Sequence, residues 1–201
     1  ASNVLVINAA VPAKNVAELV RLEKSKPGTL NYGSAGSGSP AHLGGEMLNM
    51  MAGIRMTHVP YKGVSQAVID LVAGSVHVMI PSPGSAIAQV KAGKLRVLGI
   101  ASPQRLRGAL AGAPTLREQG MDSVSSNWRM VVGPKDMSAP QIQFWDGVLG
   151  KAVQLPEWKK DVEDSLQEFV YLNSRDSLKF CEQENMDKFR TLTELGLAKQ
   201  P

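Results

Sequence analysis

The feature that most constrains the fold is a regular alternation of strand and helix patterns between residues 4 and 100. Short aliphatic runs bounded by turn residues predict strands, and apolar residues at helical spacing predict helices. The predicted strands cover residues 4–7, 30–32, 56–59, 76–80 and 95–100, and the predicted helices cover 16–26, 43–51, 64–73 and 85–92. This order is typical of βαβ units, so we expect an α/β fold with a largely parallel sheet flanked by helices.

Turn residues mark the ends of these segments. Asn15 introduces the first helix and Pro27-Gly28 closes it, while Gly74 and Gly93 stop the third and fourth helices. Glycine is frequent, with 19 residues, and aromatic residues make up only 5%. That balance is common in α/β proteins, whose strand-to-helix turns need glycine and whose cores are aliphatic.

The character of the chain changes in its last third. Residues 128–132 predict one more strand, and beyond Gly133-Pro134 the pattern is helical over residues 140–153, 156–166 and 174–195. The shift at Gly133-Pro134 is therefore the predicted domain boundary.

Composition excludes several classes of protein. The net charge is +4, but Lys and Arg are scattered, which argues against a nucleic-acid face and indicates only a weak bias toward anionic small ligands. Cys181 is the single cysteine, so neither an intrachain disulfide nor a cysteine-based zinc site can form. No segment approaches the ~20 apolar residues of a membrane span. The first residues lack a signal-peptide pattern, so for an exported protein we expect the signal peptide to have been removed.

The segment with the clearest functional character is a glycine-serine loop between a predicted strand and a predicted helix. It consists of Gly33, Ser34, Ala35, Gly36, Ser37, Gly38 and Ser39. The first turn of a helix has N–H groups without partners and a partial positive charge, which together attract anions. The glycines permit close backbone approach, the serines add hydroxyl donors, and Ser39 can cap the helix. The loop therefore predicts an anion site, with a glycine-rich turn that binds no ligand as the alternative.

Other chemistries fit this loop less well. The nucleotide motifs are absent, because no Gly-Lys-Ser/Thr ending is present and the three glycines have the wrong spacing for a dinucleotide fingerprint. No serine of the loop is central in a Gly-x-Ser-x-Gly elbow, which disfavours a serine hydrolase. The histidines are His42, His58 and His77, and none has metal-motif spacing. We interpret His42 as a local hydrogen-bonding or packing residue and the other two as ordinary sheet positions.

Four motifs together resemble a known family. They are Asn31-Tyr32-Gly33-Ser34-Ala35-Gly36-Ser37-Gly38-Ser39 with His42-Leu43, then His58-Val59-Pro60-Tyr61-Lys62-Gly63, Lys91-Ala92-Gly93-Lys94-Leu95-Arg96 and Ala113-Pro114-Thr115. In this order they resemble the substrate-binding proteins of tripartite tricarboxylate transporters, the TctC or Bug family. The resemblance extends over nearly the whole chain.

The resemblance implies a type II periplasmic binding protein fold, in which two α/β lobes joined by crossing strands close over a small carboxylate. It assigns residues 1–11 to a crossing strand, 12–125 to the second lobe, 126–133 to the return hinge strand and 134–201 to helices of an incomplete first lobe. On this interpretation the helices lack their usual partner, so Trp145, Trp158, Phe169 and Phe189 should be exposed or covered by another chain, for example in a homodimer.

The resemblance also implies the ligand contacts. It assigns carboxylate binding to the amides and hydroxyls of residues 34–39, and Ser82 can donate where other members carry Asp-Asn. Arg129 can pair with a second carboxylate, or is a surface arginine of the hinge strand. Tyr61 and Lys62 are expected to order the loop.

The implied function is capture of a small carboxylate, such as a di- or tricarboxylate or an amino acid, in the periplasm for a membrane transporter. No cofactor, metal or nucleic acid is expected, and no catalysis. A ligand-sensing module for a signalling partner uses the same cleft and stays open as an alternative, as does a small-molecule enzyme. The chain alone is expected to bind its ligand more weakly than about 1 mM.

Overall fold

The computed structural model describes residues 2–194, 196 and 198, so the predicted end of the last helix at Leu195 lies outside the described residues. The chain divides into two units, Ala1–Trp128 and Arg129–Pro201. The boundary lies five residues before the predicted one at Gly133-Pro134. Each unit is compact by itself.

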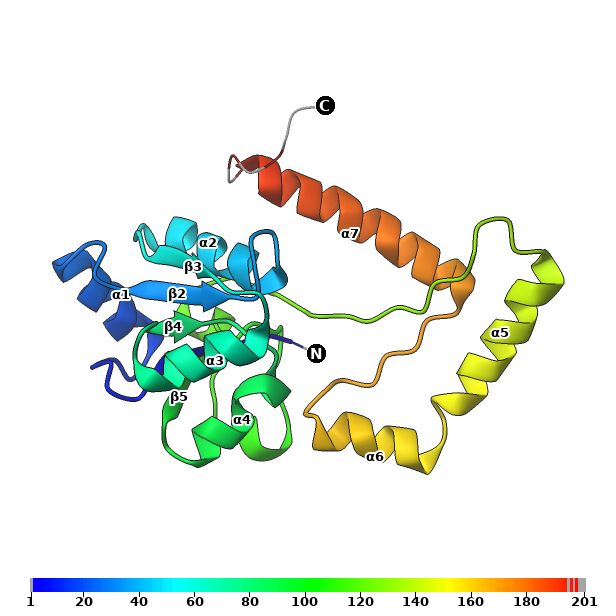
Figure 1. Ribbon diagram of the computed structural model, residues 1–201, viewed down its shortest axis with the longest axis horizontal. Coiled ribbons are helices and arrows are strands. Elements are labelled where there is room, and N and C mark those ends of the chain that lie inside the picture. Colours follow the sequence, from blue (N-terminus) through cyan, green and yellow to red (C-terminus); the bar gives the residue numbers. More distant parts are fainter. Residues whose placement is uncertain (1, 195, 197, 199–201) are drawn as a thin grey trace. The chain divides into compact units, whose positions relative to one another are not determined.

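The first unit is an α/β layer structure, as predicted (Figure 1). Its strands are β1 (Val4–Asn8), β2 (Asn31–Ser34), β3 (Thr57–Pro60), β4 (Val78–Met79) and β5 (Leu95–Ile100). Its helices are α1 (Val16–Ser25), α2 (Pro40–Ala52), α3 (Val64–Ala73) and α4 (Pro83–Lys91), followed by the 3₁₀ turns η1 (Gly108–Leu110) and η2 (Arg117–Gln119). Each predicted strand and helix before residue 101 therefore forms, although β4 is only two residues long.

The five strands form one mixed sheet with the order β3-β2-β4-β1-β5. β2 is parallel to both β3 and β4, whereas β1 is antiparallel to β4 and β5. Four strands therefore share one direction and β1 alone is reversed, which the alternation of patterns did not predict. The carboxyl ends of β3, β2 and β4 meet at the same edge of the sheet, and ligands of open α/β sheets bind outside such an edge.

The sheet is the centre of the core. All five residues of β1 are buried, so the sheet is covered on both faces. On one face α2 packs against β2 and β3, and on the other α3 packs against β1, β2 and β4. A strand that is buried on both faces reads as a continuous aliphatic run, which is how β1 appears in the sequence.

Capping residues fix the helix ends where the sequence indicated. Asn15 caps α1 by accepting a hydrogen bond from the N–H of Glu18, and Gly74 ends α3 in the left-handed conformation. Asn49 of α2 both donates to the carbonyl of Met56 and accepts from its N–H, at 3.0 Å each, which ties the end of α2 to the residue before β3. These local contacts place the loop between β2 and α2 on a rigid frame.

The second unit consists of α5 (Ala139–Ala152), α6 (Pro156–Asp164) and α7 (Ser174–Glu194). The predicted strand at residues 128–132 is wrong: these described residues carry no strand, and Val131 and Val132 are 73% and 80% exposed. A strand requires a neighbouring strand to satisfy its N–H and C=O groups, and the sheet formed by the described residues includes no strand beside this segment. The role of residues 126–133 as a hinge stays a prediction.

The helices of the second unit expose large apolar side chains. Trp145 of α5, Trp158 of α6 and Phe189 of α7 are between 50% and 57% exposed, and Phe169, in the segment between α6 and α7, is 43% exposed, so these four side chains are exposed as expected. A homodimer through them stays a prediction. Within the described residues, none of the helices is long and apolar enough to cross a bilayer.

Arg96 of β5 holds the segment between β1 and α1 in place. Its guanidinium donates to the carbonyls of Ala9, Val11 and Ala13 at 3.3, 3.2 and 2.8 Å. We expect Arg96→Gln to lower the free energy of unfolding by about 1–2 kcal/mol, because one amide cannot replace three hydrogen bonds from a planar fork. Urea denaturation measures the loss. The exposed Arg55→Gln is the control, and an equal effect of the two changes would refute this role.

Candidate functional site

The glycine-serine loop follows β2 and leads into α2, at the carboxyl edge of the sheet. Gly36 and Gly38 have φ values of +122° and +80°, so the predicted left-handed turns are present at these two glycines. Ser39 is the N-cap of α2, and its hydroxyl oxygen accepts a hydrogen bond of 3.3 Å from the N–H of His42. Ala35, Ser37 and Gly38 are exposed, so this part of the loop faces solvent.

Several N–H groups of the loop already bind protein atoms. Gly36 donates to the Ser34 hydroxyl at 3.2 Å, Gly38 to Nδ1 of His42 at 3.0 Å, and Ser39 to the Gly36 carbonyl at 3.2 Å. The N–H groups of Ala35 and Ser37 have no acceptor among the described residues. Within the loop, the donors left for an anion in this conformation are thus those two amides and the hydroxyls of Ser37 and Ser39.

Side chains of β2 point alternately to the two faces of the sheet. Tyr32 and Ser34 lie on the α2 side and are both fully buried. Gly33 faces the other way, where a β-carbon would touch Tyr61, Ala67 and Val76 at 3.4 to 3.6 Å. Ser34 therefore contributes to the site from below the loop, and its hydroxyl does not reach solvent.

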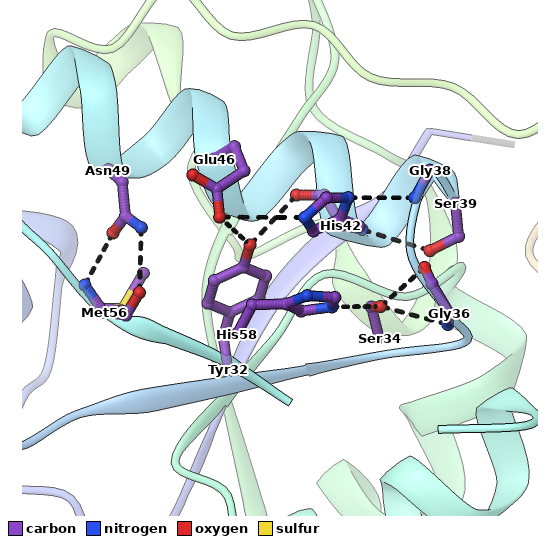
Figure 2. Close-up of polar contacts among 10 residues, drawn as sticks. All are labelled: Tyr32, Ser34, Gly36, Gly38, Ser39, His42, Glu46, Asn49, Met56 and His58. Carbon is purple, nitrogen blue, oxygen red and sulfur yellow. Dashed lines mark hydrogen bonds and ion pairs between the residues drawn. The ribbon is translucent and has the colours of Figure 1, made fainter. Parts of the chain in front are cut away.

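A cluster of polar side chains lies under the loop and connects β2, β3 and α2 (Figure 2). It consists of Tyr32, Ser34, His42, Glu46 and His58. The rings of His42 and His58 stack with centroids 4.0 Å apart, and the ring of Tyr32 stacks on His58 at 5.0 Å. The Tyr32 hydroxyl donates to the Glu46 carboxylate, and Nε2 of His42 lies 3.9 Å from the same carboxylate. We call this set the histidine cluster.

Burial changes the acidity of two members of the histidine cluster. Burial and then the hydrogen bond to Glu46 raise the pKa of Tyr32 above its ordinary value, so the phenol stays protonated. Burial first, and then the neighbouring His42, lower the pKa of His58, while the charge of Glu46 opposes this. The cluster therefore holds a neutral phenol and favours a neutral His58 at neutral pH.

Tyr61 directly follows β3 and contacts the loop, in line with the ordering role that the resemblance implied. Its N–H donates to the Ser34 carbonyl at 2.9 Å, and its hydroxyl donates to Asp70 of α3 at 2.7 Å. Burial and the hydrogen bond to Asp70 raise the pKa of Tyr61 to about 12. The role expected of Lys62 in ordering the loop stays a prediction.

The other two predicted ligand contacts differ in where the structure places them. Ser82 is the N-cap of α4 and follows β4, whose carboxyl end is at the same edge of the sheet as the loop. Its hydroxyl lies 3.0 Å from the hydroxyl of Ser85. Arg129 begins the second unit, so a contact with the ligand stays a prediction.

Sequence reasoning found His42 but missed its partners. The interpretation of His42 as a local hydrogen-bonding residue is confirmed by its bond from Gly38. His58 is a strand residue as expected, but its Nε2 also lies 2.7 Å from the Ser34 hydroxyl. His77 is not in a strand, because it directly precedes β4. Its backbone N–H donates to the side-chain oxygen of Asn31, and its ring nitrogen Nδ1 lies within hydrogen-bond distance of the same oxygen. The i, i+4 spacing of His42 and Glu46 was the available signal for the cluster.

A hollow lies near the amino end of β4, away from the loop. It has a volume of about 350 Å³ and is lined mainly by apolar atoms of residues around Asn8, Val11, Leu22, Leu30 and His77. Asn8 already donates to the carbonyls of Leu71 and Val72, and its side-chain oxygen accepts from Ala10. This hollow offers little polar chemistry, and the described residues contain no group of three acidic, histidine or cysteine side chains placed to bind a metal ion.

Comparisons with known proteins agree on one family. Residues 1–197 match the model of the tripartite tricarboxylate transporter family receptor. A relative from Cupriavidus necator, the UPF0065 protein in the gbd 5' region, is 32% identical over 195 residues, which are 97% of this chain and 59% of that protein. Protein BugT of Bordetella pertussis is 31% identical over 152 residues, or 75% of this chain and 46% of BugT. The chain thus spans about half the length of these curated relatives.

Solved structures show the same fold. Rpa4515 of R. palustris with adipate aligns with a TM-score of 0.91 and 24% identity over 98% of this chain and 66% of that one. The periplasmic binding protein BugD aligns with a TM-score of 0.89 and 22% identity over 99% of this chain and 67% of its own. Likenesses at this identity establish the architecture, which is that of periplasmic binding proteins.

Proposed function

Since the chain belongs to the tripartite tricarboxylate transporter receptor family, we propose that it binds a small carboxylate at the loop of residues 33–39 and delivers it to a membrane transporter. The observation that carries the proposal is the pair of unbonded N–H groups of Ala35 and Ser37, on exposed residues just before α2. Helix starts favour anions because their free N–H groups and dipole act together.

The geometry supports a carboxylate held at the edge of the sheet. Ser37 and Ser39 add hydroxyls to the two amides, and Ser82 follows the neighbouring parallel strand at the same edge. The structure of Rpa4515 is a complex with adipate, a dicarboxylate, which favours this ligand class. Arg129 is the proposed partner of a second carboxylate.

We propose capture without chemistry, in the periplasm. Among the described residues of the site, Ser34 with His58 is the pair that could serve as nucleophile and base, and Ser34 is 0% exposed, so a substrate cannot reach its hydroxyl. The family is described as receptors of a transporter, and BugD is a periplasmic binding protein, which support export and transport.

A titration followed by NMR tests the site. We expect adipate and citrate to shift the amide signals of Ala35 and Ser37 first, with saturation in the range of about 10 mM, because two amides and two hydroxyls on an open surface bind weakly. Acetamide, which has the same size as acetate but no charge, should leave these signals in place.

Two variants that each add one negative charge, one in the loop and one far from it, test where the carboxylate binds. Ser37→Asp should weaken carboxylate binding at least about tenfold by repulsion at the site. Ser75→Asp adds the same charge to an exposed residue before β4, at the opposite edge of the sheet, and should change little. Equal effects of the two changes, or first shifts outside the loop, would overturn the proposal.

A further inference from the structure

One member of the histidine cluster, His42, is hydrogen-bonded to an N–H group of the loop. Gly38 donates its N–H to Nδ1 of His42, so this nitrogen carries no proton in the observed structure. A neutral His42 must then carry its proton on Nε2, which lies 3.9 Å from the carboxylate of Glu46. His42 thus accepts from the loop on one side and faces a carboxylate on the other.

The hydrogen bonds of Ser34 make His58 a donor, whereas Nδ1 of His42 is an acceptor. The Ser34 hydroxyl donates its single proton to the Gly36 carbonyl at 3.0 Å. It must therefore accept from Nε2 of His58, 2.7 Å away, and it also accepts from the N–H of Gly36. His58 in this arrangement is a donor that keeps the first half of the loop in place.

The two rings are too close for both to be charged. Their centroids are 4.0 Å apart, and two imidazolium ions at this distance repel each other strongly. The titratable groups that face His42 are Glu46 of α2, Tyr32 of β2 and His58 of β3. The phenol of Tyr32 stays neutral and burial lowers the pKa of His58, whereas Nε2 of His42 lies beside a carboxylate that can pair with a charged ring.

We propose that His42 is a positioning residue that makes carboxylate binding proton-linked: protonation of Nδ1 releases the Gly38 N–H, which then becomes a donor for the bound carboxylate. The proposal rests on the proposed function of the loop and adds its regulation. A proton on His42 cannot coexist with the bond from Gly38, since both would place a hydrogen on Nδ1. It also adds a positive charge below the anion site, so binding tightens as the pH falls.

The first part of the test needs no ligand. In the full chain, NMR follows the imidazole Cε1–H signals and the Gly38 amide from about pH 5 to about pH 8, the range in which imidazoles titrate. We expect the Gly38 amide to titrate with the midpoint of His42. A Gly38 signal that does not follow His42 overturns the inference.

The second part uses acetate, which remains ionised across about pH 6 to about pH 8. We expect acetate to bind about tenfold more tightly at the lower pH. His42→Gln keeps an acceptor for Gly38 and a donor toward Glu46 but does not titrate, so it should fold and bind with one affinity at both pH values. His77→Gln removes a histidine at the opposite edge of the sheet and should retain the pH dependence.

The outcomes separate the two proposals. If acetate binds equally well at both pH values, the proposed function stands and the proton linkage is overturned. If Gly38 follows His42 but acetate binds at neither pH, the release of the amide is supported and the carboxylate site is refuted. If His42→Gln retains the full pH dependence of the wild-type chain, His42 is not the positioning residue.

Discussion

Gly45→Ala is expected to destabilise the first unit by about 2–3 kcal/mol, although alanine is the better helix former by about 1 kcal/mol. Gly45 lies within α2, where the helix passes directly over the ring of Tyr32. A β-carbon at this position would overlap ring atoms of Tyr32. The ring has no room to withdraw, because it is fully buried, stacks on His58 and is bonded to Glu46.

Urea denaturation monitored by circular dichroism measures this effect. Gly147→Ala is the matched control: it lies inside α5 with nothing within 4 Å of the added carbon, and it should be neutral or stabilising. In a chain that carries Tyr32→Leu, Gly45→Ala should lower the free energy of unfolding by less, because the ring that clashes with the added β-carbon is gone. A double-mutant cycle measures this coupling. A Gly45→Ala chain as stable as wild type would show that α2 can move away from β2.

Much of the first unit could be predicted because its signals are local. Asn15 and Gly74 mark helix ends through hydrogen bonds and φ angles that depend on few neighbours. The reversed direction of β1 depends on pairing with β4 and β5, about 70 and 90 residues away in sequence, and leaves no local pattern. The predicted strand at residues 128–132 failed for the same reason, since a β-rich composition does not supply a partner strand.

In the candidate site, too, the local features could be predicted from the sequence and the long-range contacts could not. The glycine-serine loop and its N-cap Ser39 were predicted from composition and spacing, and the structure has them. The histidine cluster was not predicted, because it requires the register that places His58 beside Tyr32, together with a helix that carries His42 and Glu46 over both. Spacing within one helix is visible in a sequence, but contacts between β2, β3 and α2 are not.

Outside the candidate site, the substitution with the largest expected effect on stability is that of the buried acidic residue Glu23. It lies in α1 with 1% exposure, and its two carboxylate oxygens accept hydrogen bonds from the N–H groups of Gly28 and Leu30 at 2.6 and 3.0 Å. The carboxylate thereby closes the turn between α1 and β2. Its placement determines where β2, and hence the loop at its far end, begins.

We expect Glu23→Ala to lower the free energy of unfolding by about 3 kcal/mol, because it leaves two backbone donors without an acceptor and opens a cavity. Glu23→Gln should cost less, since it fills the same space and its carboxamide oxygen still accepts from one N–H, although its NH2 group then opposes the other N–H. Lys24→Ala, at the exposed neighbouring position, should change stability by less than about 0.5 kcal/mol. Thermal and urea denaturation of the three variants give the order, and hydrogen exchange at Gly28 and Leu30 should accelerate in Glu23→Ala. Unchanged exchange at both amides would mean that the carboxylate does not hold this turn.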